Sequence, residues 1–187
     1  MALVESNMLP LGTPAPGFNL LDTVSGKTLT VNDLFSEKAT VLMFICNHCP
    51  YVVHVKAELV RLAHDYQSLG VSFVAISSNN VVKHPLDSPE LMPVFAHESG
   101  FTFPYLYDQT QAVARAYDAA CTPDFYVFDG NQKLRYRGRL DDSRPKVENP
   151  KPVTGRDLRA ALNAILANEP VSEVQIPSMG CNIKWAE

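Results

Sequence analysis

The sequence predicts an α/β domain with a central mixed β-sheet flanked by helices on both faces. Short apolar runs typical of buried strands alternate with helical segments along most of the 187 residues, and a predicted hairpin closes the series. Hydrophobic residues make up 46% of the chain and charged residues 19%, so one sizeable core can form. We therefore expect a single domain over residues 1–187, with its core at about 10–168 and a C-terminal tail at 169–187.

The first elements follow from turn residues and from one unbroken apolar run. Several prolines and glycines favour an extended arm, Ser25-Gly26 marks a hairpin turn, and the apolar run indicates a buried strand. The elements expected up to residue 45 are an extended arm (1–17), an N-terminal hairpin (18–21 and 27–30), a short helical turn (31–35) and a buried strand (40–45).

The clearest helix is expected at 50–69. Its apolar residues recur at helical spacing on one face, and Gly70 follows where a C-terminal glycine belongs. The later elements are a strand (71–76), a polar loop (77–89), a helix up to residue 98 with Pro89 at its first position, a strand (105–107), a helix (111–117), a hairpin (124–128 and 133–137), a loop (141–153) and a helix opened by a capping box (154–167).

The main chemical motif is Cys46-Asn47-His48-Cys49-Pro50, at the junction between the predicted strand and the long helix. A helix N-terminus carries unpaired N–H groups and partial positive charge, which favour a thiolate. Cysteine pKa values in such pairs fall to about 3.5–7.5. We expect Cys46 to be the more exposed, attacking sulfur and Cys49 to be the resolving thiol. Asn47, His48 and Pro50 are expected to tune the pair, and a protonated His48 would make the disulfide more oxidising.

Two other interpretations of the cysteine pair stay open. Zinc prefers four ligands and usually a second Cys/His pair, whereas Cys121 and Cys181 are isolated in the sequence. The pair could also be two ordinary buried cysteines, although its position at a strand end and its polar insert favour chemistry. We expect no metal, and no cofactor other than the redox-active disulfide itself.

The net charge and the distribution of apolar residues limit which partners and which cell compartment we expect for the protein. The net charge of −4 argues against binding to nucleic acid or to an anionic membrane. No segment approaches the roughly 18 consecutive apolar residues of a membrane helix, and the N-terminus lacks the pattern of a secretory signal. Four cysteines are too few for a disulfide-stapled secreted scaffold. A cytoplasmic protein is expected, in which a close cysteine pair is catalytic or metal-binding.

A second signal is Thr122-Pro123, directly before the predicted strand at 124–128. A C-x-x-C at a strand-to-helix junction, then Thr-Pro before a later strand, then a hairpin, resembles the thioredoxin-like superfamily. The resemblance covers about residues 10–168. Within it, Gly-Thr-Pro-Ala-Pro-Gly-Phe at 12–18 and the long insert at 79–100 resemble the redoxin branch, related to alkyl hydroperoxide reductase and thiol-specific antioxidant proteins.

More narrowly, the chain is similar to a group of peroxiredoxin-like bacterial proteins. Their motifs appear here as Cys-Asn-His-Cys-Pro-Tyr (46–51), Cys-Thr-Pro-Asp-Phe (121–125) and Gly-Cys-Asn-Ile-Lys-Trp (180–185). The resemblance implies that Pro123 is cis and shapes a substrate groove, with Thr122 offering its backbone to an incoming chain. It implies a thiol–disulfide oxidoreductase acting on protein or small-molecule thiols and disulfides, with a thioredoxin- or glutathione-type electron donor and a possible homodimer.

A thiol-dependent antioxidant peroxidase is the alternative function. Peroxiredoxins carry Thr or Ser three residues before the peroxidatic cysteine and Pro four residues before that. If Cys49 takes that place, Cys46 and Leu42 stand where the Thr and Pro belong. If Cys46 takes it, Met43 and Ala39 stand there, and the position of the peroxiredoxin arginine falls near Pro123. These departures place disulfide exchange first. A non-enzymatic thioredoxin-like binding or zinc module is the third interpretation.

The remaining cysteines are possible accessory thiols. Cys121 directly precedes Thr122-Pro123, so it is either a third redox sulfur or a small core residue, and we favour the core. Cys181 lies in the tail with Trp185, the only tryptophan. It either resolves a disulfide with another thiol or anchors the tail.

Overall fold

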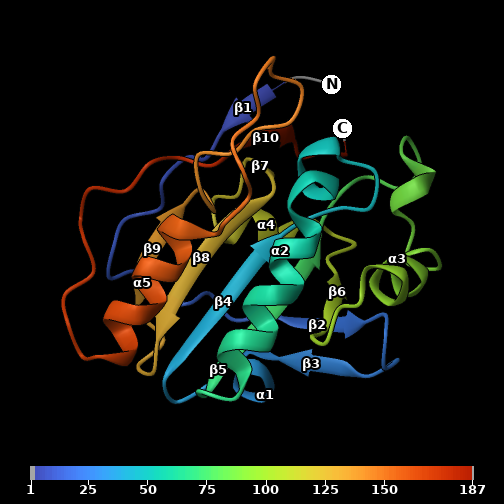
Figure 1. Cartoon of the computed structure of the whole chain (residues 1–187). Helices are drawn as coiled ribbons and strands as arrows, with labels where there is room; N and C mark the ends of the chain where they lie inside the picture. The colour runs from blue at the N-terminus through green and yellow to red at the C-terminus, as the bar shows by residue number, and fades with distance from the viewer. Residues whose placement is uncertain (1–2, 187) are drawn as a thin grey trace.

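The computed structural model describes residues 3–186 and contains a seven-stranded mixed sheet (Figure 1). Its strands are β2 (Asn19–Asp22), β3 (Thr28–Thr30), β4 (Ala39–Phe44), β5 (Val71–Ser77), β6 (Tyr105–Tyr107), β8 (Asp124–Asp129) and β9 (Leu134–Gly138). They lie in the order β3-β2-β6-β5-β4-β8-β9. β5 pairs in parallel with β4 and β6, whereas β8 is antiparallel to both β4 and β9. The predicted mixed sheet and both predicted hairpins are confirmed.

Helices cover both faces of this sheet, as the alternation of strands and helices predicted. They are α1 (Val31–Leu34), α2 (Pro50–Gln67), α3 (Met92–Ser99), α4 (Ala112–Ala116) and α5 (Arg156–Leu166), with a 3₁₀ turn at Pro85–Asp87. Side chains of α2, α3 and α5 join the core on one face, and those of α1 and α4 join the core on the other.

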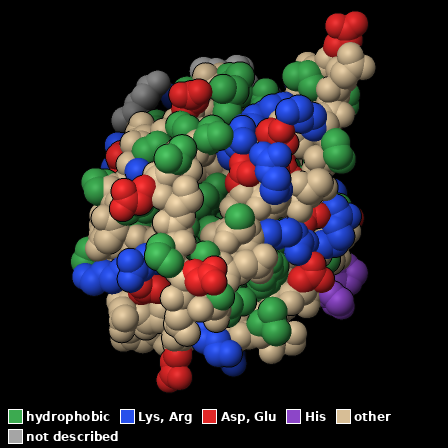
Figure 2. Space-filling view, turned by 60° about the vertical axis from the view of Figure 1, so that its left-hand side comes forward, with side chains coloured by type: hydrophobic (Ala, Val, Ile, Leu, Met, Phe, Trp, Pro, Cys, Tyr) green, Lys and Arg blue, Asp and Glu red, His purple; other side chains and the backbone are tan. Residues whose placement is uncertain are grey.

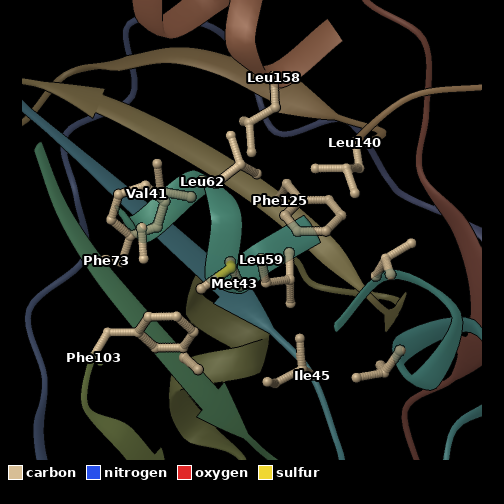
Figure 3. Packing of buried hydrophobic residues seen from close by; sticks show 14 of the residues in the cluster. Val41, Met43, Ile45, Leu59, Leu62, Phe73, Phe103, Phe125, Leu140 and Leu158 are labelled. Atoms are coloured by element: carbon tan, nitrogen blue, oxygen red, sulfur yellow. The ribbon is translucent and has the colours of Figure 1, made fainter. Parts of the chain in front are cut away.

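Close packing joins α2 to the central strands of the sheet. Figure 3 shows Leu59 of α2 beside Met43 of β4 and Phe125 of β8, and all three side chains are fully buried. Burying one such side chain contributes about 1.5–3 kcal/mol to folding. The middle of α2 is therefore held firmly against β4 and β8.

Segments near both ends of the chain pair with β7 in a second, smaller sheet that the sequence did not reveal. β1 (Leu3–Glu5), β10 (Met179–Asn182) and β7 (Cys121–Thr122) pair antiparallel in the order β1-β10-β7. This small sheet lies near the start of α2, at the top of Figure 1. The expected arm and tail are thus partly strands. The residues that pair in them, such as Leu3 and Cys181, lie near opposite ends of the sequence.

Two predicted helix starts are wrong. α3 begins at Met92, so Pro89 lies in the turn before the helix and not at its first position. Ahead of α5, the expected capping box does not form, because Gly155 adopts a left-handed conformation with φ of 65°. The carboxylate of Asp141 accepts hydrogen bonds from the N–H groups of Thr154 and Gly155 instead, each at 2.7 Å.

Positive and negative side chains are mixed on the face of the molecule that Figure 2 shows. On that face, basic and acidic side chains lie next to one another without forming one basic patch. Ion pairs between basic and acidic side chains include Arg135 with Asp129 and Arg139 with Asp157, both at 2.6 Å. Among the helices of residues 3–186, none has the length and apolar character needed to cross a bilayer.

Candidate active site

The C-x-x-C motif lies at a strand-to-helix junction, as predicted. β4 ends at Phe44, Cys49 is the N-cap residue of α2, and Pro50 is the first residue of that helix. The carbonyl of Cys49 accepts hydrogen bonds from the N–H groups of Val52 and Val53, both at 3.0 Å. Proline suits this position because the first helical N–H has no partner within the helix. Cys49 therefore faces the positive end of the helix dipole.

Three sulfurs gather around Thr122. Cys49 Sγ lies 3.2 Å from the carbonyl oxygen of Thr122, and Cys46 Sγ lies 3.6 Å from its side-chain hydroxyl. Cys181 Sγ, from β10, lies 2.9 Å from Cys49 Sγ. All four cysteines are free thiols, and the peptide bond between Thr122 and Pro123 is cis, as the resemblance implied.

Cys121 belongs to the packed interior beside this cluster. It is fully buried, and its Sγ lies 3.7 Å from the carbonyl oxygen of Pro123. Burial raises the pKa of the Cys121 thiol, and the nearby carboxyl of Asp124 adds to that effect. Among the hydrogen bonds of residues 3–186, that of the Cys121 thiol goes to a carbonyl oxygen and not to Cys49, so this environment favours the core interpretation of Cys121.

Neither cysteine of the motif is exposed to solvent, although Cys46 was expected to be the more exposed of the two. Cys46 is 1% exposed and Cys49 is fully buried. Hydrogen bonding from the Cys46 thiol lowers the pKa of Cys49 from 9.0 to about 5, with help from Cys181 and the Val52 N–H, although burial opposes the shift. That same bond to Cys49 raises the pKa of Cys46 well above its usual value, as do burial and the carboxylate of Asp87. The thiolate is therefore favoured on Cys49.

A buried carboxylate holds the loop between the two cysteines. Asp87 is fully buried, and its Oδ1 accepts hydrogen bonds from the N–H groups of Asn47 at 2.8 Å and His48 at 3.2 Å. Its Oδ2 accepts a bond from Asn79 Nδ2 at 2.8 Å and lies 2.6 Å from His48 Nδ1. The negative charge of Asp87 would offset the positive charge of a protonated His48. The predicted effect of His48 on the cysteine pair is thus opposed by the charge of Asp87, which the sequence did not reveal.

Asn47 and His48 each have a further partner. The hydroxyl of Tyr105 donates a hydrogen bond to Asn47 Oδ1 at 3.0 Å. The His48 ring stacks on the His84 ring, with centroids 5.4 Å apart and planes within 3°. These contacts fix the orientation of the motif's two central side chains.

The expected substrate edge at Thr122 is occupied by the chain itself. Cys181 of β10 is paired with Thr122, and Thr122 is almost completely buried. A strand edge offers one row of backbone hydrogen-bonding groups, so a second chain has no place on this side while β10 is paired. The expectation that Thr122 is open to an incoming chain is therefore not met in this structure. Pro123 lines a cavity of about 20 Å³ together with Tyr51 and Met179, among others.

Among residues 3–186, one group of side chains could hold a metal ion. The ligand atoms of Cys46, His48 and Asp87 all lie within 4.8 Å of one another. Zinc is usually held by four ligands in structural sites and by three plus a water in catalytic ones. An ion here would have to replace the present contact between His48 and Asp87.

Sequence reasoning missed Asp87 and Asn79 and could not place Cys181. Asp87 and Asn79 lie in the predicted polar loop, where buried and solvated polar residues look alike in sequence. Cys181 was noted as a possible accessory thiol. Its position depends on the pairing of three very short strands, which leaves no periodic signal.

The comparisons define first a class of fold and then a family. The thioredoxin domain of a thiol-disulfide oxidoreductase from Bacteroides vulgatus matches with a TM-score of 0.62 at 16% identity, covering 81% of this chain and 96% of that one. This likeness shows a thioredoxin-like fold. The AhpC/TSA family matches residues 11–137, and the chain belongs to that family.

Two relatives have more sequence in common with this chain. An uncharacterized conserved protein from Geobacillus kaustophilus, known from its crystal structure, is 60% identical, with a TM-score of 0.97 over 100% of this chain and 97% of its own. The thiol-disulfide oxidoreductase ResA of Geobacillus thermodenitrificans is 26% identical over 132 residues, which are 70% of each chain.

Proposed function

We propose that the protein is a thiol–disulfide oxidoreductase whose redox centre is the pair Cys46 and Cys49. The observation that carries this proposal is the environment of Cys49, whose pKa is lowered to about 5 at the N-terminus of α2 by hydrogen bonding from Cys46. A thiolate with a second thiol beside it is the arrangement that disulfide exchange needs. The redoxin family and the similarity to ResA support the same chemistry.

In the proposed reaction, the Cys49 thiolate attacks one sulfur of a substrate disulfide. A mixed disulfide forms on Cys49, and the other substrate sulfur leaves as a thiolate. Cys46 then loses its proton and attacks Cys49 Sγ, which forms the Cys46–Cys49 disulfide and releases the second substrate thiolate. The substrate is reduced to two thiols, and the enzyme gains one disulfide. In this scheme Cys49 attacks and Cys46 resolves, the reverse of the roles expected from the sequence.

Burial of the sulfurs sets a condition on the substrate. Cys49 is fully buried and Thr122 is covered by β10, so a protein disulfide reaches Cys49 only when β10 moves away. Small disulfides need less opening. The enzyme disulfide would be returned to two thiols by a thioredoxin- or glutathione-type electron donor, and protein or small-molecule thiols and disulfides remain the proposed partners.

Peroxidase activity is the second candidate, and the closed site is the observation that favours it. Hydrogen peroxide is small enough to reach a buried thiolate that a protein disulfide contacts only after β10 moves away. Cys49 would become a sulfenic acid as one peroxide oxygen is transferred and water leaves, and a neighbouring thiol would then form a disulfide with release of a second water. Within residues 3–186, no arginine donates a hydrogen bond to a cysteine sulfur. Without such a donor for the peroxide, we rank disulfide exchange first.

A side-by-side assay separates the two activities. The reduced protein is mixed with a protein disulfide, with oxidised glutathione, and with hydrogen peroxide, and free thiols are counted over time. We expect rapid oxidation by the disulfides, loss of this reaction in Cys49→Ser, and an unchanged rate in the matched control Cys121→Ala. Rapid oxidation by peroxide with inert disulfides would reverse the ranking. One equivalent of tightly bound zinc and thiols that no disulfide oxidises would instead establish a binding or zinc module.

A further inference from the structure

Cys181 is the second thiol that contacts Cys49. Its Sγ lies 2.9 Å from Cys49 Sγ, whereas the two sulfurs of a disulfide are about 2.05 Å apart. A shift of about 1 Å along the line between the sulfurs would bring them to bonding distance. Cys49 thus has two thiol neighbours, Cys46 and Cys181, and both stabilise its thiolate.

β10 holds Cys181 in this place through contacts specific to its sequence. A side-chain carbon at Gly180 would lie 2.1 Å from the carbonyl oxygen of Thr122, so only glycine permits this close approach. The hydroxyl of Ser178 donates a hydrogen bond of 2.6 Å to the carbonyl of Pro123. Cys181 is itself only 5% exposed. The strand therefore seats Cys181 firmly beside the motif.

β10 also takes the position along Thr122 at which an incoming chain was expected. The antiparallel pairing of Cys181 with Thr122 presents a sulfur of the same chain to Cys49. A substrate cysteine would have to be presented to the same thiolate. The C-terminal strand is therefore placed as an internal partner for disulfide exchange.

We propose that Cys181 is a third redox cysteine, which replaces Cys46 as the disulfide partner of Cys49. The proposal rests on the proposed function, because reduction of a substrate disulfide supplies the Cys46–Cys49 disulfide. Cys181 loses its proton and attacks Cys49 Sγ. The Cys49–Cys181 bond forms, the Cys46–Cys49 bond breaks, and Cys46 takes up a proton. The number of disulfides is unchanged, so the exchange consumes no oxidant or reductant, and it ties β10 covalently to the start of α2.

A purely structural role for Cys181, as a buried anchor of the tail, is the competing explanation. Cys121 provides the matched comparison, because it is also buried and lies on the paired strand β7. The sulfur of Cys121 contacts a carbonyl oxygen of Pro123, not another sulfur. A structural anchor would keep the fold without ever bonding to Cys49.

Mass spectrometry of the oxidised protein tests the proposal. Trypsin places Cys46 and Cys49 in the peptide 39–56, Cys181 in 160–184 and Cys121 in 116–133. Full-length Cys46→Ser is oxidised with oxidised glutathione and digested without reduction. We expect a disulfide that links 39–56 to 160–184, unchanged in Cys46→Ser/Cys121→Ala and lost in Cys46→Ser/Cys181→Ser. A stable glutathione adduct on Cys49 without this link, or a link to 116–133, would overturn the proposal.

The wild-type protein gives a second test that does not depend on a folded variant. After oxidation by glutathione, free thiols are alkylated with one reagent, and the thiols released by reduction are alkylated with another. We expect some molecules in which Cys46 is free and Cys49 and Cys181 were bonded. If only Cys46 and Cys49 are ever bonded, the proposed function stands and the role of Cys181 fails. If no molecule ever carries a Cys46–Cys49 disulfide, the proposed function itself fails.

Discussion

Removing the Cys46 thiol is expected to raise the pKa of Cys49 without abolishing its thiolate. In the wild-type protein the pKa of Cys49 falls from 9.0 to about 5, and the bond from Cys46 is the largest cause. Four pH units correspond to about 5 kcal/mol between the thiol and thiolate forms. A hydrogen bond to a charged group contributes about 1.5–3 kcal/mol, so Cys46→Ala should raise the pKa by about one to two units.

Ultraviolet absorbance of the thiolate measures this directly, because it does not require a reagent to reach the buried sulfur. The reduced wild-type protein should show one thiolate with a midpoint of about 5, so that Cys49 is about 99% ionised at pH 7. Cys181→Ala should give a smaller rise than Cys46→Ala, and Cys121→Ala should give none. The reasoning is refuted if the low midpoint persists in Cys49→Ala, or if the wild-type midpoint is that of a free cysteine.

Three further outcomes concern stability. Burial raises the pKa of Asp124 from 3.8 to about 7, so its neutral form stabilises the fold below pH 4, and this contribution is lost as the pH rises through 7. In the oxidised wild-type protein, the free energy of unfolding should therefore fall by about 4 kcal/mol between pH 4 and pH 7. This fall should be absent in Asp124→Asn, and a variant with the same pH profile as the wild type would contradict the reasoning. Gly180→Ala should cost about 1–3 kcal/mol and speed alkylation of Cys49, because the new carbon meets the Thr122 carbonyl; an unchanged alkylation rate would show that β10 does not guard the site. Leu59→Ala should cost about 2–5 kcal/mol in denaturant unfolding while the Cys49 midpoint stays in place, and a shifted midpoint would mean that the helix start had moved.

Elements with a periodic or continuous apolar pattern could be predicted from the sequence. The run at 40–45 became β4, and the amphipathic segment after the motif became α2, which ends close to Gly70. The hairpin around Asp129-Gly130 formed between β8 and β9. In each case the signal lies within the segment or its turn, so no knowledge of distant contacts was needed.

The small sheet could not be predicted, for a physical reason. Its strands have two to four residues each, too few for an alternating pattern to stand out. Leu3 pairs with Cys181, so the contact joins segments at opposite ends of the chain. The start of α5 was predicted wrongly for a similar reason. The N–H groups before this helix donate hydrogen bonds to Asp141, which precedes Gly155 by 14 residues. A partner that is distant in sequence overrode the local capping pattern.

The same distinction separates the two halves of the candidate site. The sequence places Cys46 and Cys49 correctly, because a C-x-x-C between a strand and a helix is a local pattern. The hydrogen bond between the two cysteines has the largest effect on which sulfur carries the charge, and groups brought from elsewhere add to it: Asp87 acts against a thiolate on Cys46, and Cys181 favours one on Cys49. An isolated motif would have the helix N-terminus as its main source of asymmetry. Tertiary contacts therefore reinforce the roles of the two cysteines, and undocking of β10 would change the ionisation of Cys49 as well as its access to substrate.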